Sequence, residues 1–231
     1  MAHGLAAIKF SLYPVATCIL DEVVARWGSV DACDSATQGD AVPKSEADEF
    51  LRRWVRSNNI KGNISVLWDP ALPVDGRVSM STNSKNLTSR RFTLSVFDPP
   101  EGARCSILTS NGLVCFAQHE LGTHVIRSLN EGHQPWAGKR AAWGIGNFNS
   151  RGHVAVEEGL ATLNTAHAAP KPYLSSVALL YYAACVADTM GFTALFHDLE
   201  KYVESPLRRF RLACRVKFGC SDPEAPGGFG K

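Results

Sequence analysis

One short stretch constrains the fold of this 231-residue chain more than any other, because two histidines there flank a glutamate. The stretch contains His119, Glu120 and His124. In the familiar zinc-binding pattern the two histidines are four residues apart and share one face of a helix. Here the second histidine comes one residue later, so on a regular α-helix the two rings would point about 140° apart. Both rings can reach one metal ion only if the helix contains a local insertion.

A π-helical turn is such an insertion, and π turns are frequent at functional sites. Gly122 lies between the two histidines, where the missing side chain makes the turn easiest to form. We therefore predict a π turn here, with His119 and His124 as metal ligands and Glu120 as a base on a metal-bound water. The alternative is a chance pair, since the chain has seven histidines.

The composition is that of an ordinary globular chain, with 45% hydrophobic and 20% charged residues. The formal net charge of +2 does not point to a nucleic-acid partner, and we expect none. Seven cysteines occur without a Cys-x-x-Cys pair. This pattern predicts reduced thiols in a cytoplasmic protein and neither disulfides nor a cysteine-type zinc site.

The longest apolar run, over 174–187, is interrupted by two serines and ends before Asp188. It is shorter than the roughly 20 residues that a membrane span needs. The N-terminal apolar run is short, is broken by Pro14 and has no clear cleavage site. We therefore predict neither a signal peptide nor a membrane segment, and interpret 174–187 as a buried core helix.

Apolar residues recur at helical spacing in most of the chain, and three short segments have the alternation of strands. Helices are predicted over 14–27, 45–58, 110–127, around Glu158, and over 172–190, 192–203 and 208–217. Strands are predicted over 63–68, 77–82 and 91–97. Loops are predicted over 29–43 and 131–153. Thr109 or Ser110 is the predicted cap of the central helix, and Ser45 with Asp48 resembles a capping box.

Five pieces of the sequence together carry a family resemblance. They are 119–127, with its His-Glu-x-x-x-His pattern and Arg127, then 134–136, 157–161 (Glu-Glu-Gly-Leu-Ala), 179–182 and 198–202. This set resembles the microtubule-associated tyrosine carboxypeptidase family, which is related to bacterial QEGLA-motif proteins. The resemblance is clearest from about residue 105 onward and weaker over 14–104. The bacterial proteins have glutamine where this chain has Glu157.

The resemblance implies an α+β metallopeptidase of the gluzincin type. Such a fold is mainly helical, with a small antiparallel sheet beside the zinc-binding helix. The resemblance also implies one catalytic domain over 1–231, with helices and the sheet over about 14–104 and the zinc-binding helical part over 105–231. Compared with the family, the chain is expected to be truncated at both ends.

Gluzincins take their third ligand from a glutamate on a second helix, and in several of them Gly-x-Ala follows it. The resemblance therefore implies one Zn²⁺ ion held by His119, His124 and Glu158, with Glu120 as the catalytic base. Catalytic zinc needs three protein ligands and one open position, which this set provides. Glu157 is the alternative third ligand.

The implied activity is removal of the C-terminal tyrosine of α-tubulin, by Glu-assisted attack of zinc-bound water. The implied partner is the α-tubulin tail or another protein C-terminus, and the implied location is cytoplasmic and microtubule-associated. One alternative is a peptidase with another substrate. Another is a catalytically silent domain that keeps the metal for stability and binds tubulin or another protein. Glu120 favours the enzyme, because a purely structural zinc does not need it.

A carboxypeptidase must also bind a free carboxylate, and arginine can do so bidentately. Arg127, on the central helix, is the first candidate, and a structural ion pair with a ligand-supporting carboxylate is its alternative. Weaker candidates are Arg104, Lys139 and Arg140. Candidate donors to the oxyanion are Tyr181, Tyr182, His133 and His153, with packing or solvent as the alternative for each. Trp136, Trp143 and Phe148 are candidate walls of a tyrosine pocket, with core packing as the alternative.

Three further expectations concern the surroundings of the site. A ligating histidine usually donates its other nitrogen to an acceptor, for which Asn164, Asp188 and Glu157 are candidates. One edge strand of the sheet is expected to hold the substrate backbone, as in gluzincins. The cationic residues from Arg208 to Lys217 form either a face for an acidic tail or a merely solvated helix face.

Overall fold

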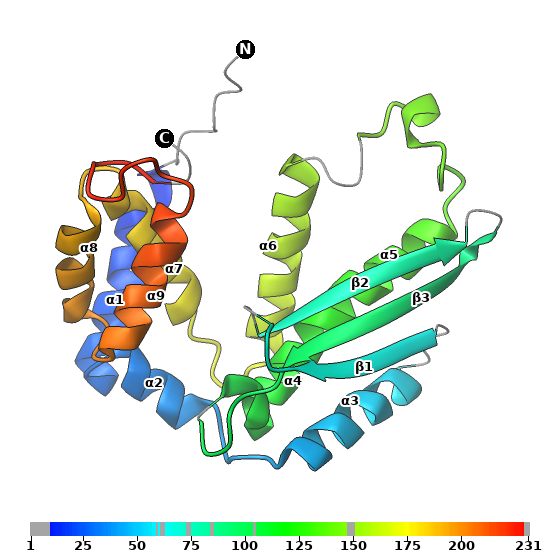
Figure 1. The fold of residues 1–231 in the computed structure, drawn as a ribbon, viewed down its shortest axis with the longest axis horizontal. Helices are drawn as coiled ribbons and strands as arrows, with labels where there is room; N and C mark the ends of the chain where they lie inside the picture. The colour runs from blue at the N-terminus through cyan, green and yellow to red at the C-terminus, as the bar shows by residue number, and fades with distance from the viewer. Residues whose placement is uncertain are drawn as a thin grey trace. The chain divides into compact units, whose positions relative to one another are not determined.

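The computed structural model describes residues 10–228 except 59, 61–62, 73–74, 84–85, 104 and 147–150. The chain forms two compact units (Figure 1). Unit 1 comprises 1–37 and 173–231, and unit 2 comprises 38–172. The predicted division near residue 104 lies inside unit 2, and a single catalytic domain stays a prediction.

Unit 1 is helical in its described part. Its elements are η1 (Phe10–Leu12), α1 (Tyr13–Trp27), α2 (Val30–Thr37), α7 (Ser175–Ala187), α8 (Phe192–Asp198), η5 (Leu199–Lys201) and α9 (Pro206–Lys217). The loop predicted over 29–43 is wrong in its first half, which forms α2. The Ser29 hydroxyl caps this helix by accepting from the Ala32 amide, and Val30 and Cys33 are buried. A short helix with only two buried apolar residues leaves little periodic signal in the sequence.

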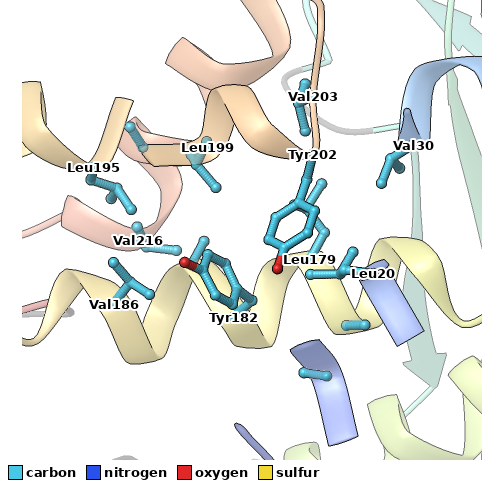
Figure 2. Packing of buried hydrophobic residues seen from close by; sticks show 14 of the residues in the cluster. Leu20, Val30, Leu179, Tyr182, Val186, Leu195, Leu199, Tyr202, Val203 and Val216 are labelled. Carbon is cyan, nitrogen blue, oxygen red and sulfur yellow. The ribbon is translucent and has the colours of Figure 1, made fainter. Parts of the chain in front are cut away.

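The core of unit 1 lies between α1, α7 and the helices that follow (Figure 2). The apolar run over 174–187 becomes α7, as predicted, and places Leu179, Tyr182 and Val186 in this core. Leu195, Leu199 and Val216 pack on them from α8, η5 and α9. No helix in the described part of the chain is both long and apolar enough to cross a membrane.

Unit 2 combines a three-stranded sheet with helices. Its elements are α3 (Lys44–Ser57), β1 (Asn63–Asp69), β2 (Gly76–Asn83), β3 (Asn86–Phe97), η2 (Ser106–Leu108), α4 (Ser110–His119), the π-helical segment η3 (Glu120–Val125), α5 (Ile126–Gly132), η4 (Arg140–Trp143) and α6 (Arg151–Ala168). In Figure 1, α3 lies along β1 and α5 lies behind β3, and both pairs are in contact. The α+β class, mainly helical, is confirmed.

The sheet is mixed, which corrects the prediction of an antiparallel sheet. Its strand order is β1-β3-β2, with β3 antiparallel to β2 and parallel to β1. After β1 the chain forms β2 at the opposite edge of the sheet. β3 then pairs with both and becomes the central strand. Phe92, Leu94 and Val96 are buried, as their alternation predicts. The sheet covers the central helix segment, and its edge strand β2 lies against η3.

Two predicted caps have different outcomes. Thr109 caps α4, because its hydroxyl accepts from the Gly112 amide at 3.2 Å. The capping box at Ser45 is wrong: α3 already begins at Lys44, and no side chain caps it. Asp48 instead accepts from Arg52 and from the Trp68 indole, which ties α3 to β1.

Candidate metal centre

The predicted π turn is present between the two histidines. The segment η3 runs from Glu120 to Val125, and the Ile126 amide donates to the Leu121 carbonyl five residues earlier. Gly122 fits the turn tightly, because a side chain there would meet the Gln118 amide oxygen at 2.5 Å. The extra residue brings the His119 and His124 rings to one side, with their centroids 5.2 Å apart.

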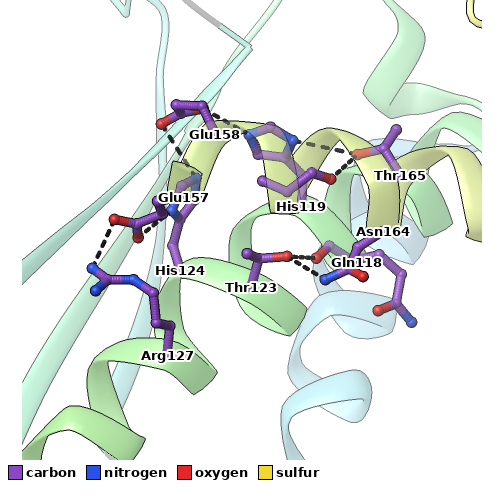
Figure 3. A network of polar contacts seen from close by, with 10 residues as sticks. Gln118, His119, Thr123, His124, Arg127, Glu157, Glu158, Asn164 and Thr165 are labelled. Atoms are coloured by element: carbon purple, nitrogen blue, oxygen red, sulfur yellow. Dashed lines mark hydrogen bonds and ion pairs between the residues drawn. The ribbon is translucent and has the colours of Figure 1, made fainter. Parts of the chain in front are cut away.

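Three side chains converge next to this turn (Figure 3). The two carboxylate oxygens of Glu158 each face one histidine, at 3.6 Å from His119 Nε2 and 3.7 Å from His124 Nε2. Ligand atoms from all three residues lie within 4.8 Å of one another, so that one ion could contact all of them. Two imidazoles and one carboxylate are the donor set of catalytic zinc, so these residues fit that ion.

The second nitrogen of each histidine is already engaged, which assigns the tautomers. His124 Nδ1 lies 2.7 Å from a Glu157 oxygen and must donate its proton to that carboxylate. His119 Nδ1 lies 3.3 Å from the Thr165 hydroxyl, which itself donates to the Ala161 carbonyl and therefore accepts here. In a neutral ring that donates from Nδ1, Nε2 is the atom that can bind a metal, and in both histidines this atom faces Glu158.

Glu157 supports the site rather than ligating from it. Its second oxygen lies 2.7 Å from Arg127, whose guanidinium also donates to His153 Nε2 at 2.8 Å. Burial raises the pKa of Glu157, but its bonds to His124 and Arg127 outweigh burial and hold the pKa below the usual value. This contact matches the ion-pair alternative for Arg127, and Glu157 is one of the predicted supporting acceptors.

Thr165 is a site residue that the sequence predictions missed. It lies on α6 two turns after Glu158, on the same face of that helix, and it fixes the orientation of His119. The predicted acceptors are Asn164, Asp188 and Glu157, so the prediction does not include a hydroxyl group. The helical spacing from Glu158 is the signal that could have identified Thr165.

Glu120 is buried beside the convergent ligands, with 8% of its surface exposed. Burial, together with the nearby carboxylates of Glu158 and Asp75, raises its pKa to about 6, although His124 opposes the shift. The Val78 backbone on β2 hydrogen-bonds to this carboxylate. A carboxylate held in this way can exchange a proton near neutral pH.

The contact with Val78 also identifies which strand edge adjoins the site. Phe97 donates to Asp75 one position before the first pair of the β2–β3 ladder, and antiparallel pairs alternate between bonded and non-bonded positions. Val78 is therefore at a position whose backbone groups point away from β3, towards η3. The edge strand predicted to lie beside the metal helix is β2.

Other predicted substrate residues have identified neighbours. Trp136 donates to Glu131 and stacks edge-on with Trp143, while Arg140 pairs with Glu131. Tyr182 is buried in unit 1, where its hydroxyl donates to Asp198. Tyr181 accepts from the Leu12 amide in the same unit. The substrate roles of Trp136, Tyr181 and Tyr182 stay predictions, and Arg104 and Phe148 lie outside the described residues.

The cationic residues of α9 divide into two groups: Arg211 and Arg215 are exposed, whereas Arg208, Arg209 and Lys217 have partners within unit 1. Arg208 pairs with Asp31 and Asp34, each at 2.8 Å, and Arg209 pairs with Glu200. Lys217 is 4% exposed, and its ammonium donates to backbone carbonyls. These side chains hold unit 1 together, so helical spacing alone overstated how many of them face solvent.

Comparison with known proteins gives several relatives. No family model matches the chain. It is 31% identical over 215 residues to the human protein named microtubule-associated tyrosine carboxypeptidase 1, covering 92% of this chain and 42% of that protein. It is 28% identical over 214 residues to the mouse protein named putative tyrosine carboxypeptidase MATCAP2, covering 92% of this chain and 38% of that one. The chain thus spans about two fifths of these relatives, whose names match the predicted family.

Proposed function

We propose that this chain, a relative of the microtubule-associated tyrosine carboxypeptidases, is a zinc carboxypeptidase that removes the C-terminal residue of a protein substrate. One observation carries the proposal: the Nε2 atoms of His119 and His124 and the Glu158 carboxylate converge beside the buried carboxylate of Glu120. A domain that kept a metal only for stability would have no use for Glu120 at that position.

His119, His124 and Glu158 would hold the zinc ion. When bound, zinc would polarise the scissile carbonyl and make a water molecule more acidic. Glu120 would accept the proton of the attacking water and pass it to the leaving amine. The bonds of Glu157 and Thr165 to the histidines would keep both Nε2 atoms unprotonated and correctly oriented.

The substrate backbone would pair with the outer edge of β2, beside Glu120. Val78 lies on this side and bonds Glu120, so an extended peptide added along this edge would pass the reacting groups. The names of the relatives point to a microtubule substrate that ends in tyrosine. The specific form of the proposal is therefore detyrosination of α-tubulin in the cytoplasm.

Mass spectrometry of a peptide ending in Glu-Glu-Tyr tests the reaction and the base together. The unchanged chain should release one tyrosine, and a zinc chelator should stop the release. Glu120→Gln should keep its zinc. Its rate of tyrosine release should fall about 10²-fold to 10⁴-fold, the usual contribution of a general base. The same peptide with an amidated C-terminus should remain intact. Equal cleavage by Glu120→Gln, or cleavage inside the amidated peptide, would contradict the proposal.

Purified tubulin, assayed in the same way, tests the substrate separately. Loss of the terminal tyrosine from tubulin and peptide alike would support detyrosination. Cleavage of the peptide alone would keep the carboxypeptidase and assign it another protein substrate.

A further inference from the structure

A second set of hydrogen bonds joins the π turn to the helix that carries Glu158. Thr123, directly before His124, is 2% exposed. Its hydroxyl donates to the Gln118 carbonyl at 3.0 Å and accepts from the Asn164 side-chain amide at 2.8 Å (Figure 3). Both of its bonding directions are therefore used inside unit 2.

The first of these bonds is specific to the π turn. In a regular α-helix a threonine hydroxyl donates to the carbonyl three or four residues earlier. Thr123 reaches the carbonyl five residues earlier, which is close enough only because the helix contains the extra residue. If the turn reverted to α-helical spacing, Thr123 would lose this acceptor and would rotate away from Asn164.

The second bond connects the turn to the third ligand. Asn164 lies on α6, the helix that also supplies Glu157 and Glu158. The chain Gln118–Thr123–Asn164 thus links the segment holding both histidines to the helix holding the carboxylate. This link acts beside the direct bond from His124 Nδ1 to Glu157, which also lies on α6.

We propose that Thr123 and Asn164 are positioning residues, which hold the π turn so that His124 meets Glu158 and His119 around one zinc ion. This inference rests on the zinc site of the proposed function. Neither residue belongs to the convergent ligand set, so their effect would pass through the position of the His124 ring. The motif therefore extends beyond its two histidines to the residue before the second one and to an asparagine on α6.

Zinc affinity, measured by competition with a chromogenic chelator, tests this role without any activity assay. Thr123→Val keeps the shape of the side chain and removes the hydroxyl, and it should weaken zinc binding about 10-fold to 100-fold, as loss of a supporting contact typically does. Thr123→Ser should restore affinity to within about threefold of the unchanged chain, because the hydroxyl returns. Asn164→Ala should resemble Thr123→Val. The double variant should lose no more than either single one, since both break the same link.

Two further measurements separate positioning from general destabilisation. Thr17→Val is a matched control, because Thr17 donates to the carbonyl of Tyr13 within α1 of unit 1. It should leave zinc affinity unchanged. With Co²⁺ in place of zinc, the visible absorption of Thr123→Val should differ from that of the unchanged chain in band position, because the ligand geometry changes.

Parent-like zinc affinity and cobalt spectrum in Thr123→Val would overturn this inference and leave the proposed function standing. A Thr123→Ser variant as weak as Thr123→Val would also overturn it, because packing and not the hydroxyl would then matter. If the unchanged chain bound no zinc, the proposed function would fail together with the inference.

Discussion

The two units both enclose polar side chains but use them in opposite ways. In unit 1 the Lys217 ammonium donates to the carbonyls of Ala187, Met190, Ala225 and Gly227, and every bond ends within the unit. In unit 2 the outer nitrogens of His119 and His124 are bonded, while their inner nitrogens converge on Glu158. A buried polar group that is fully paired stabilises the fold, whereas lone pairs aimed at one point indicate a ligand.

The strongest test of this contrast on the unit 1 side is Lys217→Met. Methionine fills a similar space but removes a charged donor from four buried or partly buried carbonyls, so we expect a loss of about 2–4 kcal/mol in the free energy of unfolding. The melting temperature should fall by about 5–15 °C. Lys139→Met, at an exposed position, is the control and should change little. Folded Lys217→Met should bind zinc as the unchanged chain does. A tenfold loss of zinc affinity would contradict the separate roles assigned to the two units.

On the unit 2 side, Glu157→Ala should affect the metal more than the fold. It removes the acceptor of His124 Nδ1 and the partner of Arg127, so zinc affinity should fall about 10-fold to 100-fold. Glu157→Gln keeps an acceptor for His124 and should lose less. Chelator competition gives the affinities, and thermal unfolding without metal gives the stabilities. An unchanged affinity in Glu157→Ala would show that the contact to His124 has no role in ligation.

The smallest effect is expected from Asp31→Asn in unit 1. Burial raises the pKa of Asp31, but the Ser205 amide and Arg208 outweigh burial and hold the pKa below the usual value. A lowered pKa contributes stability above the unfolded value of about 3.9, and that stability is lost as pH falls through the folded value. Asp31→Asn should lose about 1–2 kcal/mol at pH 7. Its deficit relative to the unchanged chain should shrink at pH 3.

Urea unfolding at pH 7 and pH 3 measures this difference directly. Asp34, the second partner of Arg208, remains in place, so the guanidinium keeps one carboxylate. A deficit that stays constant between the two pH values would contradict the assigned role of Asp31.

The sequence was most informative where spacing has a direct geometric meaning. The interval from His119 to His124 predicts a π turn because a regular helix cannot bring both rings to one ion, and η3 confirms it. The alternation at Phe92 and Leu94 likewise predicts a half-buried strand, which is present. These predictions depend only on residues close together in the chain.

Features that depend on distant partners were missed. The strand order depends on which strands β3 pairs with, and the residues of β1 alone carry no signal for this pairing. The four acceptors of Lys217 are backbone carbonyls, which every residue has, so a sequence cannot distinguish this lysine from a solvated one. For Thr165, the helical spacing from Glu158 gives the shared face of α6, and the packing of α6 against α4 then brings its hydroxyl to His119.

Elemental analysis of the purified protein after dialysis gives the zinc content per chain and tests the metal centre without any substrate. We expect one zinc ion per chain in the unchanged protein and in Glu120→Gln, and almost none in His124→Ala, with all three folded by circular dichroism. An unchanged chain without zinc, or a His124→Ala variant that retains a full equivalent, would contradict a metal centre at His119, His124 and Glu158.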